Sequence, residues 1–436
     1  FLNEEIVLMI KFPIHLWRTE KGKDTFRMKK QILRLSTSGS VDDGKSTLLG
    51  RLLFDSKNLN QDDIEKIKKR SKIEGKIDFS LFTDGLKDEK EQGITIDVAY
   101  RFFSTKNRVY IVSDTPGHIQ YTRNMITGSS LSNIMMILID VKKGITNQTK
   151  RHLFISSLLN VNHIVICINK MDLVNYDESI FYKIKNDLEK FTSKLILKDL
   201  NYIPISALNG DNIIDRSNLM NWYQGPTLMY VLENLHVSSD INRVKSRMFV
   251  QNVVKTSDNS QRFIQGKIHS GIFRKGDEIV IHPSLIKTQI KNIIYDFKSI
   301  DSSYSPMSIS IEVKDEIDIS RGNLITKKNS LPRSSRFIEV MACWLSEKEI
   351  NQNNTYTFFR VCEEIKCKII EIDYKYDIKS FSRDLGDKKI QMNSIFKCKV
   401  KLSNSLFFDS YSDNKETGSF ILIDNENSTV ACCMII

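Results

Sequence analysis

Short apolar runs alternate with amphipathic stretches from residue 30 to about residue 237. Strand-like runs occur at 108–113, 134–140 and 163–168, and helical periodicity occurs at 120–130, 146–159 and 178–191. The run at 134–140 is apolar at almost every position, which is typical of a strand covered by helices on both faces of its sheet. The pattern therefore predicts an α/β domain with a mainly parallel sheet and flanking helices.

The pattern changes after Pro226. A last helix is expected at 228–235, followed by a polar linker at 237–243. From Met248 onward, short alternating runs separated by turns predict two antiparallel β-barrels, with strands at 249–254, 266–271, 276–281, 337–341, 397–402 and 420–423. The first barrel is expected to close near Lys328. The predicted division is an N-terminal extension at 1–29, the α/β domain at 30–237, and barrels at 238–330 and 331–436.

Neither a membrane span nor an export signal is predicted from the first residues of the sequence. Residues 6–10 form an apolar run that is too short to span a bilayer, and Lys11 and Pro13 interrupt it. Positive charge does not precede this run and no small-residue cleavage site follows it, so a signal peptide is not indicated. We therefore expect a loosely attached extension.

Composition narrows the class further. The 436 residues carry a net charge of +11, but the excess is scattered Lys rather than Arg-rich blocks, so charge by itself does not establish a nucleic-acid partner. The seven Cys are odd in number and contain no pair of C-x-x-C motifs, which indicates neither a disulfide framework nor a zinc site. Reduced, partly buried thiols in a cytosolic protein are the expectation.

The stretch Gly39-Ser-Val-Asp-Asp-Gly-Lys-Ser-Thr47 fits the pattern G-x-x-x-x-G-K-[ST] at every specified position. Backbone N–H groups of such a loop point at phosphate oxygens, its Lys contacts the β- and γ-phosphates, and its Ser or Thr hydroxyl ligates Mg²⁺. The flanks agree, since 32–35 reads as the end of a strand and 45–55 as a helix with Leu48, Leu49, Leu52 and Leu53 on one stripe. A glycine turn with an exposed lysine is the structural alternative. We call residues 39–47 the phosphate loop.

Three further motifs begin where predicted strands end, and ligands of α/β sheets bind at that edge. Asp114-Thr-Pro-Gly117 can hold Mg²⁺ through water and offer an N–H to a γ-phosphate. Asn169-Lys-Met-Asp172, here called the guanine loop, ends in a carboxylate that can accept two hydrogen bonds from guanine, whereas adenine lacks that donor pair. Ser206-Ala207, here called the closing pair, follows a predicted strand at 202–205 and can close the base pocket.

Two residues are candidates for the hydrolysis step. Thr95, in Glu91-Gln-Gly-Ile-Thr-Ile-Asp97, can reach Mg²⁺ when a γ-phosphate is present and release it after hydrolysis, which would make residues around 56–97 a loop ordered by the nucleotide. An ordinary glycine turn before a strand is the alternative. His118 follows Gly117 directly and can orient the attacking water. The other six His show no ligand spacing and are expected to be structural.

Together these motifs predict a complete set of site residues. The predicted GTP-binding residues are Gly39, Ser40, Val41, Asp42, Asp43, Gly44, Lys45, Ser46, Thr47, Asp114, Thr115, Pro116, Gly117, His118, Asn169, Lys170, Met171, Asp172, Ser206 and Ala207. The predicted Mg²⁺ ligands are Ser46, Thr95 and, through water, Asp114. Lys45, Thr95 and His118 are the predicted catalytic residues, and GTP and Mg²⁺ the predicted cofactors.

The order of one GTP-binding domain and two β-barrels resembles the translational GTPases, such as elongation factor Tu. The details are more similar to one branch, the large GTP-binding subunits of bacterial sulfate adenylyltransferases. Besides the phosphate loop, the resemblance rests on Thr83-Asp-Gly-Leu86, Glu91–Arg101, Asp114–His118 with Gln120–Met125, and Asp315–Gly322. Translation factors usually carry His at the place of Asp43 and Thr at the place of Ser46.

Several positions depart from that branch without removing a phosphate or guanine contact. Ile119 stands where the family usually has Glu, Ser38 where it has Cys, Thr83 where it has Val, and Cys433 where it has Gly. We expect Ile119 to affect the hydrolysis rate and Cys433 to affect packing of the last domain.

The resemblance implies a cytoplasmic heteromer, a heterodimer or larger, with a small subunit that makes adenylyl sulfate and diphosphate from ATP and sulfate. GTP hydrolysis on this chain would help to drive that uphill nucleotidyl transfer. Neither nucleic acid nor membrane is expected as a partner. Some relatives carry a fused adenylylsulfate kinase, and since no second phosphate loop occurs before Ile436, we expect that activity to be absent.

Two other classes remain open. A translation factor delivering aminoacyl-tRNA would suit the basic charge and would show tRNA binding that weakens steeply with salt. A non-catalytic module with a degenerate nucleotide site is the second alternative. The intact Lys45, Ser46, Thr95 and Asp114 argue against the second.

Overall fold

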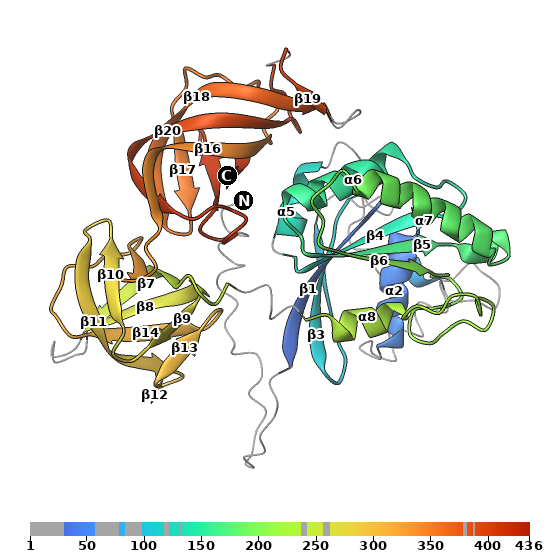
Figure 1. Ribbon diagram of the computed structural model, residues 1–436, viewed down its shortest axis with the longest axis horizontal. Coiled ribbons are helices and arrows are strands. Elements are labelled where there is room, and N and C mark those ends of the chain that lie inside the picture. The colour runs from blue at the N-terminus through green and yellow to red at the C-terminus, as the bar shows by residue number, and fades with distance from the viewer. Residues whose placement is uncertain are drawn as a thin grey trace.

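We describe the protein from a computed structural model, shown in Figure 1. The described residues are 30–56, 78–82, 98–116, 122–130, 132–236, 242–255, 262–377, 382–386 and 389–436. They form an α/β unit and two antiparallel barrels, so the predicted fold class is confirmed. The predicted N-terminal extension lies outside the described residues, and the predicted domain boundaries stay predictions.

The α/β unit is built on a six-stranded sheet with the order β2-β3-β1-β4-β5-β6. Its strands are β1 Gln31–Gly39, β2 Ala99–Ser104, β3 Arg108–Asp114, β4 Ile134–Asp140, β5 His163–Asn169 and β6 Asp199–Pro204. All neighbours pair in parallel except β2, which runs antiparallel to β3 at one edge. The carboxyl ends of five strands therefore meet at one side of the sheet, where ligands of such sheets bind.

Helices cover both faces of this sheet. They are α2 Lys45–Asp55, α5 Thr122–Ser130, α6 Asn147–Leu158, α7 Glu178–Thr192 and α8 Leu228–Asn234, with short 3₁₀ turns η1 Phe79–Phe82 and η3 Met171–Val174. Strand β4 is buried at every position because its side chains alternate between two cores. Met135, Ile137 and Ile139 pack with α5, α6 and α7. The alternate residues of β4 pack with α2 and α8.

Both C-terminal units are closed barrels. In the first, the ring β10-β15-β7-β8-β14-β11 is closed by pairing of β11 with β10. Its strands are β7 Arg247–Lys255, β8 Arg262–Ser270, β9 Ile272–Arg274, β10 Glu278–His282, β11 Ile286–Tyr295, β12 Lys298–Ser299, β13 Ser302–Tyr304, β14 Ser308–Val313 and β15 Leu324–Lys327. Closure leaves each of the six ring strands paired on both sides, which removes exposed sheet edges.

The second barrel repeats this arrangement in the ring β17-β21-β22-β16-β20-β18, closed by pairing of β17 with β18. Its strands are β16 Arg333–Trp344, β17 Tyr356–Arg360, β18 Glu363–Asp377, β19 Ser382–Asp384, β20 Ile395–Phe408, β21 Ser419–Ile423 and β22 Thr429–Ile435. Cys433 is buried in its core.

The second barrel packs against helix α6. Met341, Cys343 and Leu345 share one apolar core with the helices on that face of the sheet. The Phe154 and Tyr376 rings lie edge to face with centroids 5.0 Å apart, and the Tyr411 hydroxyl donates to the carbonyl of Leu159 at 3.1 Å. Because α6 is covered by the sheet on one side and the barrel on the other, it is buried almost all round.

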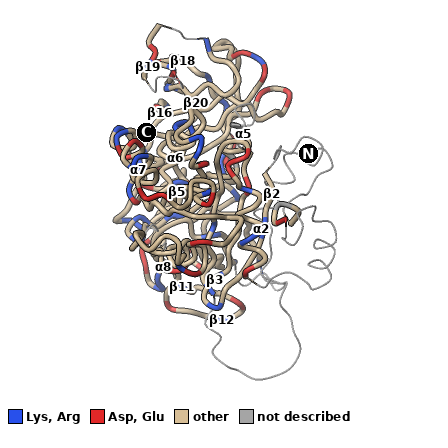
Figure 2. The backbone as a smooth tube through the Cα atoms, turned by 90° about the vertical axis from the view of Figure 1, so that its right-hand side faces the viewer, with Lys and Arg blue, Asp and Glu red and all other residues tan. Residues whose placement is uncertain are grey.

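Charge is distributed along the whole chain. In Figure 2, Lys and Arg positions are interspersed with Asp and Glu along the described tube. This agrees with the scattered lysines of the sequence. Within the described part of the chain, no helix has the length and apolar character that a membrane span requires.

Candidate functional site

The phosphate loop joins β1 to α2, as predicted. Strand β1 ends at Gly39 and α2 begins at Lys45. A Cβ on Gly39 would lie 2.9 Å from the carbonyl oxygen of Leu138. Gly44 has φ +92°, and a Cβ there would lie 2.4 Å from the side-chain nitrogen of Asn169. Both positions therefore require glycine, one for close approach to β4 and the other for a left-handed backbone and close approach to the guanine loop.

Lys45 is buried inside the phosphate loop. Its ammonium donates to the carbonyls of Gly39 at 2.8 Å and Ser40 at 3.1 Å, and the residue is 8% exposed. An ammonium has three donors, so one is left for a phosphate oxygen. Burial lowers the pKa of Lys45, and the nearby carboxylates of Asp114 and Asp43 oppose that shift. The ammonium is thus held by carbonyl groups at the start of α2, where the helix dipole also attracts anions.

Asp43 closes the phosphate loop on itself. One carboxylate oxygen accepts from the N–H of Ser40 at 2.6 Å, while the other is buried without a hydrogen-bond partner. Burial raises the pKa of Asp43, and the bond from Ser40 opposes it. The residue therefore shapes the loop, although the sequence motif leaves this position unspecified.

Asp114 lies at the carboxyl end of β3, beside the phosphate loop. It is 4% exposed and accepts a hydrogen bond from the Thr37 hydroxyl at 3.0 Å. The N–H of Thr115 donates to the Thr37 carbonyl at 3.3 Å, which ties the end of β3 to β1. Ser46 is half-buried in the first turn of α2. A hydroxyl and a carboxylate oxygen are donors that Mg²⁺ accepts.

Asn169 joins three predicted motifs. Its amide nitrogen donates to the carbonyl of Asp43 at 2.8 Å, and its amide oxygen accepts from the N–H of Ala207 at 2.9 Å. The phosphate loop, the guanine loop and the closing pair are thereby connected through one buried side chain. These contacts bring the three predicted motifs together in one site.

Asp172 is oriented by the closing pair. The Ser206 hydroxyl donates to one Asp172 carboxylate oxygen at 2.6 Å, and Ser206 is fully buried. This bond fixes the plane of the carboxylate, so that acceptor positions remain for the two donors on the edge of guanine. Met171, between Lys170 and Asp172, is instead packed into the apolar core.

Three contacts at the carboxyl edge of the sheet were not predicted from the sequence. Lys170 pairs with Asp140 at the end of β4, at 2.8 Å. Burial would raise the pKa of Asp140, but the bonds from Lys170 and from the N–H of Lys142 outweigh it and lower the pKa. The Lys143 ammonium donates to the carbonyl of Val41 at 2.9 Å, and the Thr146 and Ser40 hydroxyls are 3.0 Å apart. The available signal was that Asp140, like Asp114, ends a predicted strand.

The described residues do not include all of the predicted site residues. Thr95, Gly117 and His118 lie outside the described residues, as do Thr83 and Ile119. Of the others, Pro116 and Thr115 are buried after β3, Asp42 is exposed in a left-handed conformation, and Val41 and Thr47 are half-buried. Within the described ranges, no group of three His, Cys, Asp or Glu is arranged to hold a metal.

The first and last domains of this chain match known protein families. Residues 30–256 match the family of the elongation factor Tu GTP binding domain, and residues 337–436 match the GTP-eEF1A C-terminal domain-like family. The GTP-bound Ski7 GTPase-like domain of S. cerevisiae is similar at a TM-score of 0.51 and 20% identity, covering 93% of this chain and 97% of that one. That likeness shows the shared fold.

More similar sequences come from bacteria. Sulfate adenylyltransferase subunit 1 of Bacteroides thetaiotaomicron is 43% identical over 421 residues, which cover 94% of this chain and 87% of that protein. The Aliarcobacter butzleri protein of the same name is 44% identical over 412 residues, covering 93% and 87%. The bifunctional enzyme CysN/CysC of Rhodopirellula baltica is 44% identical over 415 residues, and this chain spans 64% of its length. The chain therefore belongs to the sulfate adenylyltransferase subunit 1 family of the translational GTPase superfamily.

Proposed function

We propose that this chain is the GTP-hydrolysing subunit of a sulfate adenylyltransferase. It would couple GTP hydrolysis to the formation of adenylyl sulfate and diphosphate from ATP and sulfate, in a heterodimer or larger assembly with a small adenylyl-transferring subunit. The observation that carries this proposal is the bridge made by Asn169, which joins the phosphate loop, guanine loop and closing pair in a chain of this family. The names of the similar proteins do not favour the tRNA-delivering alternative.

Guanine would be selected by Asp172. The carboxylate held by Ser206 accepts from two guanine donors, whereas adenine offers no such pair. Asp172 is half-buried, and an acceptor that loses its donors when a base covers it costs free energy, so this site would reject ATP. The adenylyl transfer must then occur at an ATP site on the small subunit.

The phosphates would lie against the phosphate loop. Lys45 would direct its third N–H at the β- and γ-phosphates, and the first turn of α2 supplies further backbone donors. Mg²⁺ fits the oxygen donors present here, with Ser46 and, through water, Asp114 as ligands, and it would neutralise charge on the phosphates. Thr95 is the third proposed ligand, and Gly117 and His118 are proposed to contact the γ-phosphate and the attacking water.

Coupling would follow from the state of the nucleotide. Thr95 and Gly117 would hold their segments while the γ-phosphate is present and release them after hydrolysis. Linkage requires that the small subunit, when loaded with ATP and sulfate, shift the GTP-bound equilibrium in return. We propose a cytoplasmic location, where both nucleotides and reduced thiols are maintained.

The test uses the purified chain with and without the small subunit. We expect the chain alone to hydrolyse GTP slowly and to form no radiolabelled adenylyl sulfate from ATP, sulfate, Mg²⁺ and GTP. Addition of the small subunit should give product and should raise the GTPase rate. Adenylyl sulfate formed without a second polypeptide would contradict the proposal. A GTPase rate that stays the same when the small subunit is added would also contradict it.

A further inference from the structure

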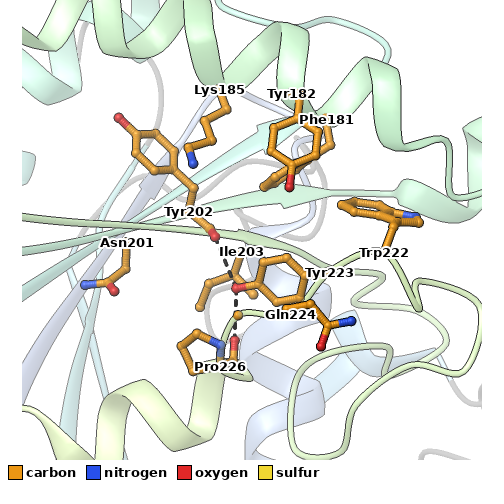
Figure 3. Close-up of a pocket in the computed structure, with 11 residues that line it drawn as sticks. Phe181, Tyr182, Lys185, Asn201, Tyr202, Ile203, Trp222, Tyr223, Gln224 and Pro226 are labelled. Carbon is orange, nitrogen blue, oxygen red and sulfur yellow. Dashed lines mark hydrogen bonds between the residues drawn. The ribbon is translucent and has the colours of Figure 1, made fainter.

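An aromatic cavity lies beside strand β6 of the GTP-binding domain. Its volume is about 320 Å³. Figure 3 shows Tyr182 and Lys185 of α7 on one side of the strand, and Tyr223 and Pro226 of the segment before α8 on the other. No residue predicted to bind GTP lines this cavity. The cavity is therefore a separate feature of the GTP-binding domain.

Strand β6 is a sheet edge, since among the described residues it pairs with β5 alone. The N–H groups of Asp199 and Ile205 donate toward β5. Because the N–H and C=O groups of a strand alternate in direction, those of Leu200 and Tyr202 point to the outer edge. The Tyr202 carbonyl accepts there from the Tyr223 hydroxyl at 3.2 Å. The N–H groups of Leu200 and Tyr202 can thus receive an added strand.

The wall of the cavity is already formed. The Tyr223 hydroxyl also contacts the Pro226 carbonyl at 3.0 Å, and the Trp222 indole N–H donates to the Tyr176 carbonyl at 2.9 Å. A Cβ on Gly225 would lie 2.4 Å from the Tyr223 ring, so only glycine lets the segment fold this tightly. A preformed pocket lowers the ordering cost of binding.

The positive charge in the cavity favours an occupant that carries a negative charge. Lys185 is the one charged residue in the lining, and no carboxylate lines it. Its ammonium lies 5.8 Å from the Tyr182 ring centre and 5.7 Å from that of Tyr202, and its contact with Glu189 is a long 3.8 Å. A carboxylate on the occupant would therefore meet a cation that is only weakly paired.

We propose that the outer edge of β6 and this cavity bind an extended acidic segment of the small subunit. The segment adds a strand through the N–H groups of Leu200 and Tyr202, places an apolar side chain among the aromatic rings, and sets a carboxylate on Lys185. The identity of the partner rests on the proposed function, whereas the chemistry of the segment rests on the cavity and the strand edge.

The test measures the affinity of the small subunit for variants of the full chain by calorimetry. Lys185→Glu reverses the charge in the cavity, and Tyr182→Ser removes part of its aromatic wall. Both should weaken binding at least tenfold, because a desolvated charge contact or an aromatic anchor is lost. Lys183→Glu is the matched control, since Lys183 is exposed on the same helix outside the lining. It should bind within twofold of the unchanged chain.

Two further measurements separate strand addition from general contact. Leu200→Pro removes an outward N–H without removing a bond to β5, and edge strands tolerate such a proline; it should also weaken binding at least tenfold. Hydrogen exchange should slow at the amides of Leu200 and Tyr202 when the complex forms. GTP affinity and the midpoint of thermal unfolding, measured for each variant, should match those of the unchanged chain and thereby show that the variant is folded.

The outcomes distinguish the two proposals. Binding that is unchanged in Lys185→Glu and Tyr182→Ser, with no new protection of the two amides, overturns this inference and leaves the proposed function standing. A small subunit that does not bind the unchanged chain at all sinks the proposed function, and the assignment of this partner with it.

Discussion

At the scale of single residues, the residues proposed to contact phosphate and the residues proposed to contact the base are held by different partners. Lys45 and Asp43 are held by the phosphate loop itself, whereas Asp172 is held by Ser206 from another strand end. Asn169 makes no predicted phosphate contact but connects both parts. Substitutions at these positions should therefore have different effects on nucleotide binding.

Replacement of Asp172 should change which base is accepted. Asp172→Asn puts a donor where the guanine amino group points, so we expect preference to move toward xanthosine triphosphate, whose O2 accepts a hydrogen bond. Affinities for the two nucleotides should be measured on the same preparation. Asp177→Asn is a suitable control, because Asp177 caps the exposed start of α7 and Asn is an equally good cap. An unchanged ratio of affinities in Asp172→Asn would refute the assignment.

Measurements of GDP binding should distinguish residues that bind the nucleotide from residues that act only on the γ-phosphate. Lys45→Ala should weaken both GDP and GTP binding, since it removes a charge from the phosphates. Thr95→Ala and His118→Ala should spare GDP binding and slow turnover, because both are predicted to act on the γ-phosphate side. The measurements are GDP affinity and partner-stimulated GTPase rate. A His118→Ala protein with an undiminished stimulated rate would remove the water-orienting role.

At the scale of elements, the phosphate loop depends on a close fit between two segments. Gly44→Ala should lower GTP affinity at least tenfold, because its Cβ would lie 2.4 Å from Asn169 and separate the phosphate and guanine loops. The left-handed φ of +92° adds about 1–2 kcal/mol of strain. Gly276→Ala is the matched control, since it has φ +87° but open space around its Cβ. It should lose similar stability and keep GTP affinity, and equal affinities in both variants would contradict the packing argument.

At the scale of the whole molecule, a buried ion pair joins the two barrels. Arg247 of β7 contacts both carboxylate oxygens of Asp409, at 2.7 and 2.8 Å, and the side chains are 1% and 4% exposed. Thr417 adds a hydrogen bond to the same carboxylate at 2.9 Å. The two barrels are thereby connected by a buried ion pair, in which each charge would be costly to bury without the other.

Loss of that partner should destabilise the protein strongly. Asp409→Ala leaves a buried guanidinium unpaired and should cost about 3–5 kcal/mol of unfolding free energy. Asp413→Ala breaks a nearby pair with Lys245 at 2.8 Å, but that carboxylate is 40% exposed, so the cost should be about 0–1 kcal/mol. Urea unfolding of both variants gives the comparison. Similar losses would show that burial does not decide the strength of these pairs.

Stability should also fall on mild acidification. Burial lowers the pKa of His152 to about 3 and that of His282 to about 4. An unfolded histidine titrates near 6.5, so below that pH the unfolded state binds more protons and stability drops until the folded pKa is reached. At about pH 5 each residue should cost on the order of 1–2 kcal/mol. Relative to the unchanged chain, His282→Gln should reduce the difference in urea midpoint between about pH 7 and pH 5.

The candidate nucleotide site could be predicted from the sequence because its motifs are short and local. A phosphate loop is built from consecutive backbone groups, and Asp172 has its place three residues after Asn169 on one loop. The alternation of strands and helices also predicted the sheet, and the strand at 134–140 agrees with β4. Period-2 runs predicted both barrels for the same reason, since they report which faces are buried.

Only the tertiary structure decided how these local pieces meet. Asn169 bonds to a carbonyl 126 positions away, and the Asp140–Lys170 pair joins neighbouring strands whose order the sequence does not state. The cavity beside β6 likewise needs α7, β6 and the segment at 222–226 together. The physical reason is that hydrophobic periodicity specifies the face each element buries, whereas contacts between distant residues depend on strand order and packing, which that local periodicity does not encode.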